Sequence, residues 1–265
     1  MNKLLKKVLV LTLMIAMVFS IAACGGDEST DDENGGGTEA GTYKAVTEAT
    51  FPPFDTVDED GNIIGFDMDL MNAIAEDQGF KVEYVDMEFD SLIPAVENGD
   101  ADIITAGMNA MDPARQAKVD FSTTYYDSKL VVVVSAENND INGVDDLTAD
   151  MKVTAQIGTT GADEAEALAS DGKIGEAVIL NEYSSCILQV INGDAAACIV
   201  DKPVAEAYIK SQDGKVKIVG DEMGAESYGF AVQKGNTELL EKINTGLQNM
   251  IDNGTYDELV AKWFN

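Results

Sequence analysis

Arg115 is the only arginine in the chain, and the other 16 of its 17 basic residues are lysines. A guanidinium group presents a rigid, planar set of N–H donors that fits a carboxylate through two parallel hydrogen bonds, which an ammonium group cannot do. Residue type alone leaves two interpretations open, a surface ion pair and a site that grips a planar anion. The second interpretation explains why lysine is not used at this position.

The chain contains no histidine, so the commonest general base and the commonest transition-metal ligand are both missing. Beyond Cys24 the cysteines are Cys186 and Cys198, which are too few and too far apart for a zinc site. Two buried thiols are favoured over a disulfide, because Cys186 lies on an apolar helical face and Cys198 in an apolar strand. The composition therefore favours a protein without a metal centre or cofactor.

The segment DTVDEDGNIIGFD carries Asp-Gly between extended flanks, which predicts a β-hairpin turn. It partly resembles a calcium loop through Asp58, Asp60 and Gly61. The first ligand position would be Thr56 and the last Asp67, in place of a bidentate glutamate, so we expect no calcium site.

Short apolar strands alternate with amphipathic helices from about residue 43 onward. Strands are predicted over 43–48, 81–85, 102–106, 130–135, 152–156, 176–180, 196–200 and 228–233. Helices are predicted over 67–78, 91–98, 113–118, 161–169, 182–192, 203–210 and 236–252. This alternation is typical of an α/β architecture with mostly parallel sheets covered by helices, and about 223 residues suffice for two modest domains.

The chain begins MNKLLKKVLVLTLMIAMVFSIAACGG, in which lysines precede an apolar run that ends at Ala23. The run is short for a membrane span and has the layout of a secretory signal peptide, residues 1–23. The last part, IAAC, resembles a bacterial lipoprotein signal, in which cleavage leaves Cys24 at the N-terminus with lipid attached. Ordinary signal cleavage with an incidental cysteine is the alternative.

Residues 24–42 contain six acidic residues, no basic residue and no large apolar one. This composition predicts a disordered linker whose ends lie on the order of 20 to 25 Å apart. Without the signal peptide the net charge would be −34, against −31 for the whole chain. A surface with this much negative charge repels phosphate backbones and anionic lipids. We therefore expect no nucleic-acid partner, and we expect the lipid anchor to make the contact with the membrane.

Seven segments resemble the family 3 extracellular solute-binding proteins, the amino-acid receptors of bacterial ABC importers. The clearest, GFDMDLMNAIAEDQGF, follows the glycine, aromatic, acid, apolar signature of that family, and only Gln78 departs from it at the last position. The others, in the family's order, are TEATFPPFD, FDSLIPAVENGDADI, KVDFSTTYY, QIGTTGADEA, VDKPVAEAYI and NGTYDELVAKWF. Together they extend over essentially all of residues 43–265.

The resemblance implies an α/β, two-lobed, periplasmic-binding-protein-like fold of type II. Each lobe would be a mostly parallel sheet flanked by helices, and two crossover strands would join the lobes. Residues 43–126 plus 229–265 would form the first lobe and residues 127–228 the second, with hinges near 125–129 and 224–228. The ligand would be clamped in the cleft between them, where helix N-termini favour an anionic group.

The resemblance also assigns residues to the carboxylate end of an amino-acid ligand. Arg115 falls where this family places the arginine that grips the α-carboxylate, although the segment after Met108 is one residue longer than usual. The backbone of Gly107 and Asn109, and Thr160 from the second lobe, would supply further donors to the carboxylate.

Asp201 falls where the family places the carboxylate that receives the α-ammonium group. Its position before Lys202-Pro203 also predicts a helix N-cap, and both roles can coexist. With one charged group from each lobe, only closure of the cleft would satisfy both charges of a zwitterion.

The pocket for the ligand side chain is less well defined by the sequence. Phe51 and Phe89 match the positions that flank this side chain, and Gln156 and Val200 match second-lobe positions that vary with specificity. Glu48 aligns with an acidic position that can meet a polar or cationic side chain, and a strand-end acid in water is the alternative. A polar and possibly cationic ligand is favoured, because burying Glu48 unpaired would cost on the order of several kcal/mol.

We therefore expect a monomeric, extracytoplasmic lipoprotein that binds a free amino acid and delivers it to an ABC permease with its ATPase. One alternative is an enzyme of the same fold, such as a cyclic carboxylic acid dehydratase with Glu48 as its acid, and another is a sensory binding domain. The pairing of Arg115 with Asp201 suits a zwitterion and favours a receptor with no catalytic residue.

Overall fold

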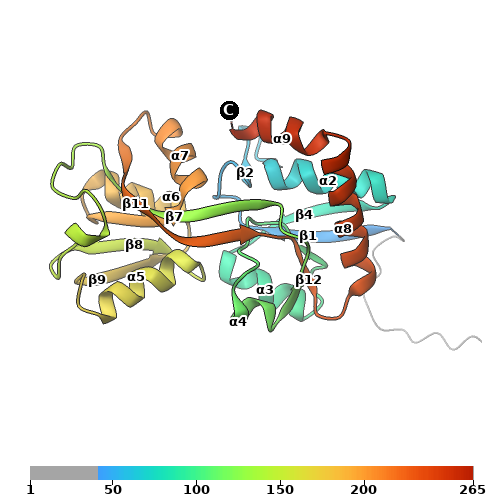
Figure 1. The fold of residues 1–265 in the computed structure, drawn as a ribbon, viewed down its shortest axis with the longest axis horizontal. Coiled ribbons are helices and arrows are strands. Elements are labelled where there is room, and N and C mark those ends of the chain that lie inside the picture. Colours follow the sequence, from blue (N-terminus) through green and yellow to red (C-terminus); the bar gives the residue numbers. More distant parts are fainter. Residues whose placement is uncertain (1–40, 265) are drawn as a thin grey trace, which may run out of the picture. The chain divides into compact units, whose positions relative to one another are not determined.

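The computed structural model describes residues 41–264. The predicted signal peptide, Cys24 and most of the predicted linker lie outside the described residues, whereas Thr42 already belongs to the first strand. The strands of the described part form two five-stranded sheets and one two-stranded hairpin (Figure 1). Between residues 41 and 264, no helix has the length and apolar character needed to cross a bilayer.

We use lobe 1 for the elements of the first sheet and those packed on it, residues 42–121 and 231–264. Its elements are β1 (Thr42–Thr47), β2 (Thr56–Val57), β3 (Ile63–Ile64), α2 (Phe66–Gln78), β4 (Lys81–Asp86), α3 (Phe89–Glu97), β5 (Ile103–Ile104), α4 (Pro113–Gln116), β6 (Val119–Phe121), β12 (Ala231–Gln233), α8 (Thr237–Asp252) and α9 (Thr255–Phe264). The strand order in the sheet is β4-β1-β5-β12-β6. Strand β1 runs parallel to β4 and β5, whereas β12 runs antiparallel to β5 and β6.

Apolar side chains cover both faces of the lobe 1 sheet. On one face, Leu70 and Ile74 of α2 are fully buried in the same cluster as Ile243 of α8. The two helices approach so closely that a Cβ at Gly246 would lie 2.7 Å from the side chain of Ile74. On the other face, α3 buries Leu92 and contacts β1, β5, β6 and β12.

We use lobe 2 for the second sheet and its helices, residues 126–228. Its elements are β7 (Tyr126–Ser135), the 3-10 helix η1 (Val144–Asp146), β8 (Lys152–Gln156), α5 (Thr160–Ser170), β9 (Glu176–Leu180), α6 (Tyr183–Asn192), β10 (Ala197–Asp201), α7 (Lys202–Ser211) and β11 (Val216–Tyr228). The strand order is β11-β7-β10-β8-β9. Strand β8 runs parallel to β9 and β10, whereas β7 runs antiparallel to β10 and β11.

Helices cover both faces of the lobe 2 sheet as well. Helix α5 buries Ala165 and Leu168 in one apolar cluster with β7, β8 and β10. Helices α6 and α7 lie in the cluster that also includes the α2 side of lobe 1, so this cluster extends through both lobes. Cys186 of α6 and Cys198 of β10 are both buried free thiols.

The fold class expected from the sequence is confirmed. Figure 1 shows two sheets flanked by helices, with β7 and β11 running side by side between the lobes. The sheets are mostly parallel, as expected, because four of the five strands in each sheet run in one direction. The strand that runs opposite to the other four is the crossover strand β7 in lobe 2 and the returning strand β12 in lobe 1.

The predicted hairpin is also confirmed, since Thr56 pairs with Ile64 in β2 and β3. Asp58 closes the turn by accepting hydrogen bonds from the backbone N–H groups of Asp60 and Asn62, at 2.9 and 2.8 Å. These bonds to its carboxylate lower the pKa of Asp58. The acidic residues of this loop therefore have a role in the turn itself.

Candidate functional site

The ends of strands from both lobes meet around one small space, which we call the central cavity. It is lined by Phe51, Phe89, Gly107, Asn109, Arg115, Gln156, Thr159, Thr160, Asp201 and Glu226. Gln156 and Asp201 are the last residues of β8 and β10, so they lie at the carboxyl edge of the lobe 2 sheet, where open α/β sheets bind ligands. The cavity measures about 10 Å³, room for one water molecule, so an amino acid can enter only when the lobes separate.

Arg115 is held in place by the short helix α4. Asp112 caps this helix by accepting hydrogen bonds from the N–H groups of Ala114 and Arg115, and Pro113 occupies the first helical position. The Nε of Arg115 lies 3.5 Å from the Asp112 carboxylate. The cap and the ion pair fix the side chain that the sequence singled out, and Arg115 is only 7% exposed.

The guanidinium group of Arg115 reaches from lobe 1 to lobe 2. Its Nη2 donates to the carbonyl oxygen of Gly158 at 3.0 Å, and its Nη1 donates to that of Asn109 at 3.4 Å. The guanidinium carbon lies 5.5 Å from the ring centre of Phe89, in the geometry of a cation–π contact. The planar donor set is thus directed into the space between the lobes.

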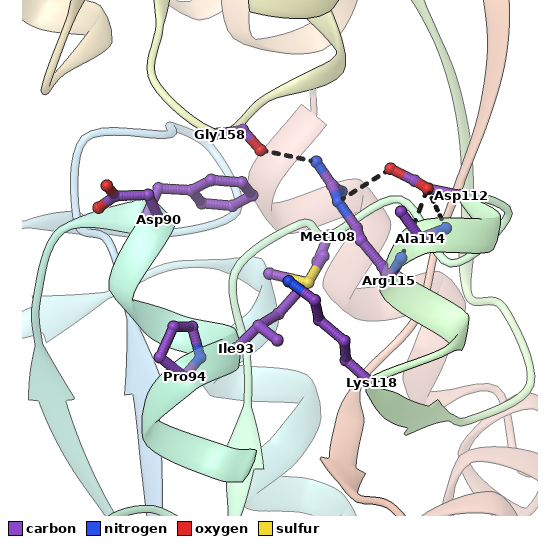
Figure 2. A pocket seen from close by; sticks show the side chains of 10 residues that line it. Asp90, Ile93, Pro94, Met108, Asp112, Ala114, Arg115, Lys118 and Gly158 are labelled. Atoms are coloured by element: carbon purple, nitrogen blue, oxygen red, sulfur yellow. Dashed lines mark hydrogen bonds and ion pairs between the residues drawn. The ribbon is translucent and has the colours of Figure 1, made fainter. Parts of the chain in front are cut away.

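A larger space, which we call the outer pocket, lies on the other side of Arg115. It measures about 210 Å³ and shares Phe89 and Arg115 with the central cavity. Figure 2 shows Arg115 between Gly158 and Asp112, with Lys118 and Met108 below it. Arg115 therefore borders both spaces.

Two acidic side chains face Arg115 in the central cavity, Asp201 and Glu226, which are 4% and 6% exposed. Asp201 occupies the N-cap position of α7, as predicted, but its side chain makes no capping hydrogen bond. It accepts a hydrogen bond from the hydroxyl of Tyr228 instead. The carboxylate is therefore directed to the cavity and not to the helix.

Burial raises the pKa of both acids. The pKa of Asp201 lies well above its usual range because of burial first and the charge of Glu226 second, while the Tyr228 hydroxyl and Arg115 lower it. Burial likewise raises the pKa of Glu226, against the lowering effects of a hydrogen bond with Thr160 and the charge of Arg115. The Arg115 charge stabilises the ionised form of each acid.

Gly107 lies beneath the ring of Phe51 and needs to be glycine. Its φ is +50°, and a Cβ would come within 2.6 Å of that ring. Its N–H donates to the Asp67 carboxylate at 2.8 Å, so it is already used within lobe 1. The sequence analysis expected this N–H to bind the ligand carboxylate, and its direction toward a buried acid argues against that role.

Asn109 and Thr160 both line the cavity, one from each lobe. The Oδ1 of Asn109 accepts hydrogen bonds from the N–H groups of Met111 and Ser227, at 3.0 and 3.3 Å. Thr160 begins α5, whose N-cap is the neighbouring Thr159. The first turn of α5 therefore ends at the cavity, where its N–H groups favour an anion.

Glu48 does not line the central cavity but adjoins it through Gln156. Its carboxylate accepts a hydrogen bond from the hydroxyl of Thr50, at 2.7 and 2.9 Å to its two oxygens. Burial raises its pKa, hydrogen bonds with Gln156 and Thr50 lower it, and the charges of Asp86 and Glu182 raise it again. This end of the site is therefore rich in negative charge.

The predicted apolar residues divide between the cavity and the core. Phe51 lines the cavity and lies 5.7 Å, between ring centres, from Tyr183 of lobe 2. Val200 does not line the cavity. It is fully buried in the apolar cluster that extends through both lobes, where it packs with residues of α6 and α7. Eight of the ten predicted ligand residues thus surround one space, and Glu48 and Val200 lie outside it.

Hydrogen bonds between the lobes surround the cavity. The Nδ2 of Asn181 donates to Glu88 at 2.7 Å, and the hydroxyl of Tyr208 donates to the carbonyl oxygen of Thr50 at 2.8 Å. Together with the bond from Arg115 to Gly158 they bring the two lobes into direct contact. This is the closed arrangement that the resemblance implied for a clamping receptor.

Comparison with known proteins places the chain in a family. The sequence profile of "Bacterial extracellular solute-binding proteins, family 3" matches residues 43–265. The chain belongs to this family. Among curated relatives, a probable histidine-binding protein of Neisseria gonorrhoeae is 32% identical over 92% of this chain and 91% of its own. The arginine-binding extracellular protein ArtP of Bacillus subtilis is also 32% identical, over 98% of each chain.

Solved structures of amino-acid-binding proteins share the fold. An ancestral arginine-binding protein bound to arginine has a TM-score of 0.80 and 41% identity, over 85% of this chain and 99% of its own. The same kind of protein bound to glutamine has a TM-score of 0.79 and 40% identity, over 86% and 99%. An ancestral amino acid-binding protein described as a precursor of cyclohexadienyl dehydratase has a TM-score of 0.77 and 36% identity, over 85% and 96%.

Two residues that line the central cavity were not found from the sequence, Thr159 and Glu226. Thr159 stands beside the predicted Thr160 and could have been found as a threonine that starts a helix, since its hydroxyl accepts from the N–H of Ala162 at 3.1 Å. Glu226 lies in the polar segment DEMGAES, where one acid among several carries no distinguishing signal. Only its position on β11 beside Asp201 brings it into the site.

Proposed function

We propose that this protein is the ligand-binding component of an ABC importer for a cationic amino acid, with arginine as the preferred ligand. The observation that carries the proposal is the placement of Arg115 opposite Asp201 and Glu226 around one closed cavity. A free amino acid carries a planar anion and an ammonium group on neighbouring atoms. These two groups match the guanidinium on one side of the cavity and the acids on the other.

The proposed binding reaction exchanges contacts within the protein for contacts with the ligand. Arg115 now donates to the carbonyl oxygens of Gly158 and Asn109, and the ligand carboxylate would take over its planar donor set. Asp201 and Glu226 would receive the ammonium group. Since Arg115 belongs to lobe 1 and both acids to lobe 2, the bound ligand stabilises the closed arrangement over the open one.

The charge around Glu48 supports a cationic ligand side chain. Glu48 is 5% exposed, and Asp86 and Glu182 are near enough for their charges to raise its pKa. A guanidinium or ammonium group placed here would offset this repulsion, whereas an apolar side chain would leave it in place. The names of the arginine-binding and histidine-binding relatives support the same choice.

We assign no catalytic residue and no cofactor to the cavity. The curated relatives named above are binding proteins, and the pairing of one guanidinium with two acids suits the retention of a zwitterion. A dehydratase would need Glu48 as its acid. The dehydratase alternative is tested by measuring turnover of a cyclic carboxylic acid by the wild-type protein and by Glu48→Gln. Turnover that is lost in the variant would show that the protein is an enzyme and not a receptor.

The proposal extends to the location of the protein and its partners. Family 3 proteins are extracellular, and we propose that Cys24 carries the lipid that holds a monomer at the outer face of the membrane beside its permease. The linker after Cys24 would keep the lobes within reach of that permease. The mass of the mature N-terminal peptide tests the lipid, and light scattering tests the monomer.

Thermal-shift screening followed by calorimetry tests the ligand. We expect arginine to raise the melting temperature most, lysine and histidine less, glutamine still less, and leucine not at all. If leucine binds as tightly as arginine, the cationic preference is wrong. If none of the common amino acids binds, the receptor function is wrong.

A further inference from the structure

Glu226 lies on one of the two strands that join the lobes. It belongs to β11, where it is paired with Ser128 of β7, and two residues later Tyr228 pairs with Asn109 of lobe 1. Its side chain lines the central cavity and is 6% exposed. Burial of an acidic side chain is unfavourable unless a hydrogen-bonding or charged group faces it.

The partner within the protein is Asp201. Both carboxyl groups line the central cavity within hydrogen-bonding reach of each other, and this contact raises the pKa of Asp201 and lowers that of Glu226. Two carboxyl groups can be hydrogen-bonded to each other only when one of them carries a proton, because two carboxylates offer acceptors alone. The two groups therefore titrate as a pair, in which one shared proton would satisfy both carboxyl groups.

The groups that face this pair come from every neighbouring element. Arg115 on α4 supplies the positive charge that acts on both acids, and Asp112 at the start of α4 supplies a weaker negative one. The hydroxyl of Tyr228 on β11 donates to Asp201, and the charge of Asp201 raises the pKa of Tyr183 on α6. With Arg115 positive and one proton shared by the pair, the charges at the centre of the cavity would cancel.

We propose that Glu226 is a second acceptor for the ligand's ammonium group beside Asp201, and that this group displaces the proton that the two acids share. The inference rests on the proposed function. An ammonium group has three N–H donors, so it can donate to both carboxylates at once, and the displaced proton passes to the solvent. Both acids are then ionised and both are satisfied.

Because the shared proton leaves on binding, the net charge of the ligand affects its affinity. After binding, the two acids and Arg115 leave one uncompensated negative charge, which a neutral zwitterion does not remove. A cationic amino acid supplies the missing positive charge through its side chain. Glu226 is thus a specificity-determining residue that favours cationic over neutral amino acids, although it does not need to touch the ligand side chain.

Calorimetry in buffers of different ionisation enthalpy counts the protons released on binding. For wild-type protein and arginine, we expect release of up to one proton per ligand at the acidic end of a series from pH 5.5 to 8.5, and an affinity that rises as pH rises. The affinity gain can reach about tenfold per pH unit where the proton is fully held. A wild-type proton count of zero at every pH overturns the proposal.

Three variants separate Glu226 from the other acids. Glu226→Gln is expected to abolish most of the proton release and to weaken arginine binding about tenfold at pH 8. Glu48→Gln removes the other buried acid of the site, and proton release should persist in it. Glu222→Gln is the matched control, since Glu222 lies on the same strand but pairs with Lys129 and Lys202 at the surface, and it should match wild type.

The outcomes distinguish this inference from the function on which it rests. Arginine binding with the same proton count in wild type and Glu226→Gln overturns the role of Glu226 and leaves the receptor function standing. Failure of every amino acid to bind the wild-type protein overturns the function itself. Should Glu226→Gln fold poorly, the proton count of the wild-type protein with glutamine and with arginine still tests the displacement.

Discussion

Two pairs of buried acids occupy different places in this molecule. In lobe 1, Asp55 and Asp67 are fully buried, and in the central cavity Asp201 and Glu226 are nearly so. Burial is the largest cause of the raised pKa of all four carboxyl groups. Residue type, burial and direction of the pKa shift are therefore the same in both places.

The two pairs differ in what faces them. One oxygen of Asp67 accepts hydrogen bonds from the N–H of Gly107 and the hydroxyl of Tyr125, at 2.8 and 2.7 Å. Burial and the charges of Asp67 and Glu48 raise the pKa of Asp55, and hydrogen bonds with Thr47 and the backbone of Phe51 lower it. Asp201 and Glu226 instead share a cavity with a guanidinium group. A raised pKa in a buried acid does not identify a ligand site, whereas a facing cation and an enclosed space do.

Removing one acid from each pair gives the largest contrast. We expect Asp201→Ala to weaken arginine binding about 100-fold, because the ammonium group would lose a charge-assisted hydrogen bond in a buried site. Asp67→Asn should change the affinity less than threefold, since its carboxylate accepts from Gly107 and Tyr125 and does not line the central cavity. Calorimetry at pH 7.5 measures both, and equal losses in the two variants would contradict the distinction.

The cation that distinguishes the cavity can be changed while its charge is kept. Arg115→Lys is expected to weaken binding at least tenfold, because a lysine ammonium cannot make two parallel hydrogen bonds to a carboxylate. Lys118→Arg, in the same segment but outside the central cavity, serves as the control and should bind as wild type does. Unchanged affinity in Arg115→Lys would contradict the assignment of Arg115 to the ligand carboxylate.

The raised pKa of Asp67 in lobe 1 should make the free energy of unfolding depend on pH. The pKa of Asp67 is raised to about 7 in the folded protein, above its unfolded value near 3.9, so its stabilising contribution is complete below about pH 4 and is lost as the pH rises toward 7. We expect the wild-type free energy of unfolding to fall by about 1 kcal/mol per pH unit between pH 5 and 7 through this group. Urea denaturation of Asp67→Asn should show a shallower fall, and an identical slope would count against the raised pKa.

The smallest expected effect concerns the side-chain end of the site. Glu48→Gln should weaken arginine binding three- to fivefold, since Glu48 adjoins the cavity only through Gln156 and does not line it. Glutamine binding should change less than twofold, because its side chain carries no charge. Parallel titrations of the same variant with both ligands measure the difference, and an equal loss for the two would show that Glu48 acts on folding instead.

The sequence predicted the two-lobed fold and most of the residues around the cavity. Arg115 could be found because it is the only arginine, and Asp201 because it lies in the segment VDKPVAEAYI, which resembles the family. Both signals are local in the sequence. The side chains they predict are held by local structure, a four-residue capped helix in one case and the end of a strand in the other.

What the sequence did not predict depends on contacts between distant segments. Strand β11 was predicted only at its end, because its exposed and buried residues follow no strict alternation and its register with β7 shifts twice. Helix α9 was treated only as a family segment, although its Trp263 donates to Asp69 of α2 at 2.7 Å. The direction of the Gly107 N–H and the meeting of Glu226 with Asp201 likewise require residues far apart in sequence to come together.

The strand order of the lobe 1 sheet has a consequence for how the chain folds during export. Strand β12 lies between β5 and β6, so that sheet stays open until the C-terminal part of the chain has crossed the membrane. Residues 126–228 form their sheet from one continuous segment and can complete it earlier. Emergence from the N-terminal end therefore lets lobe 2 complete its sheet first, while lobe 1, which contains both β1 and α9, waits for β12.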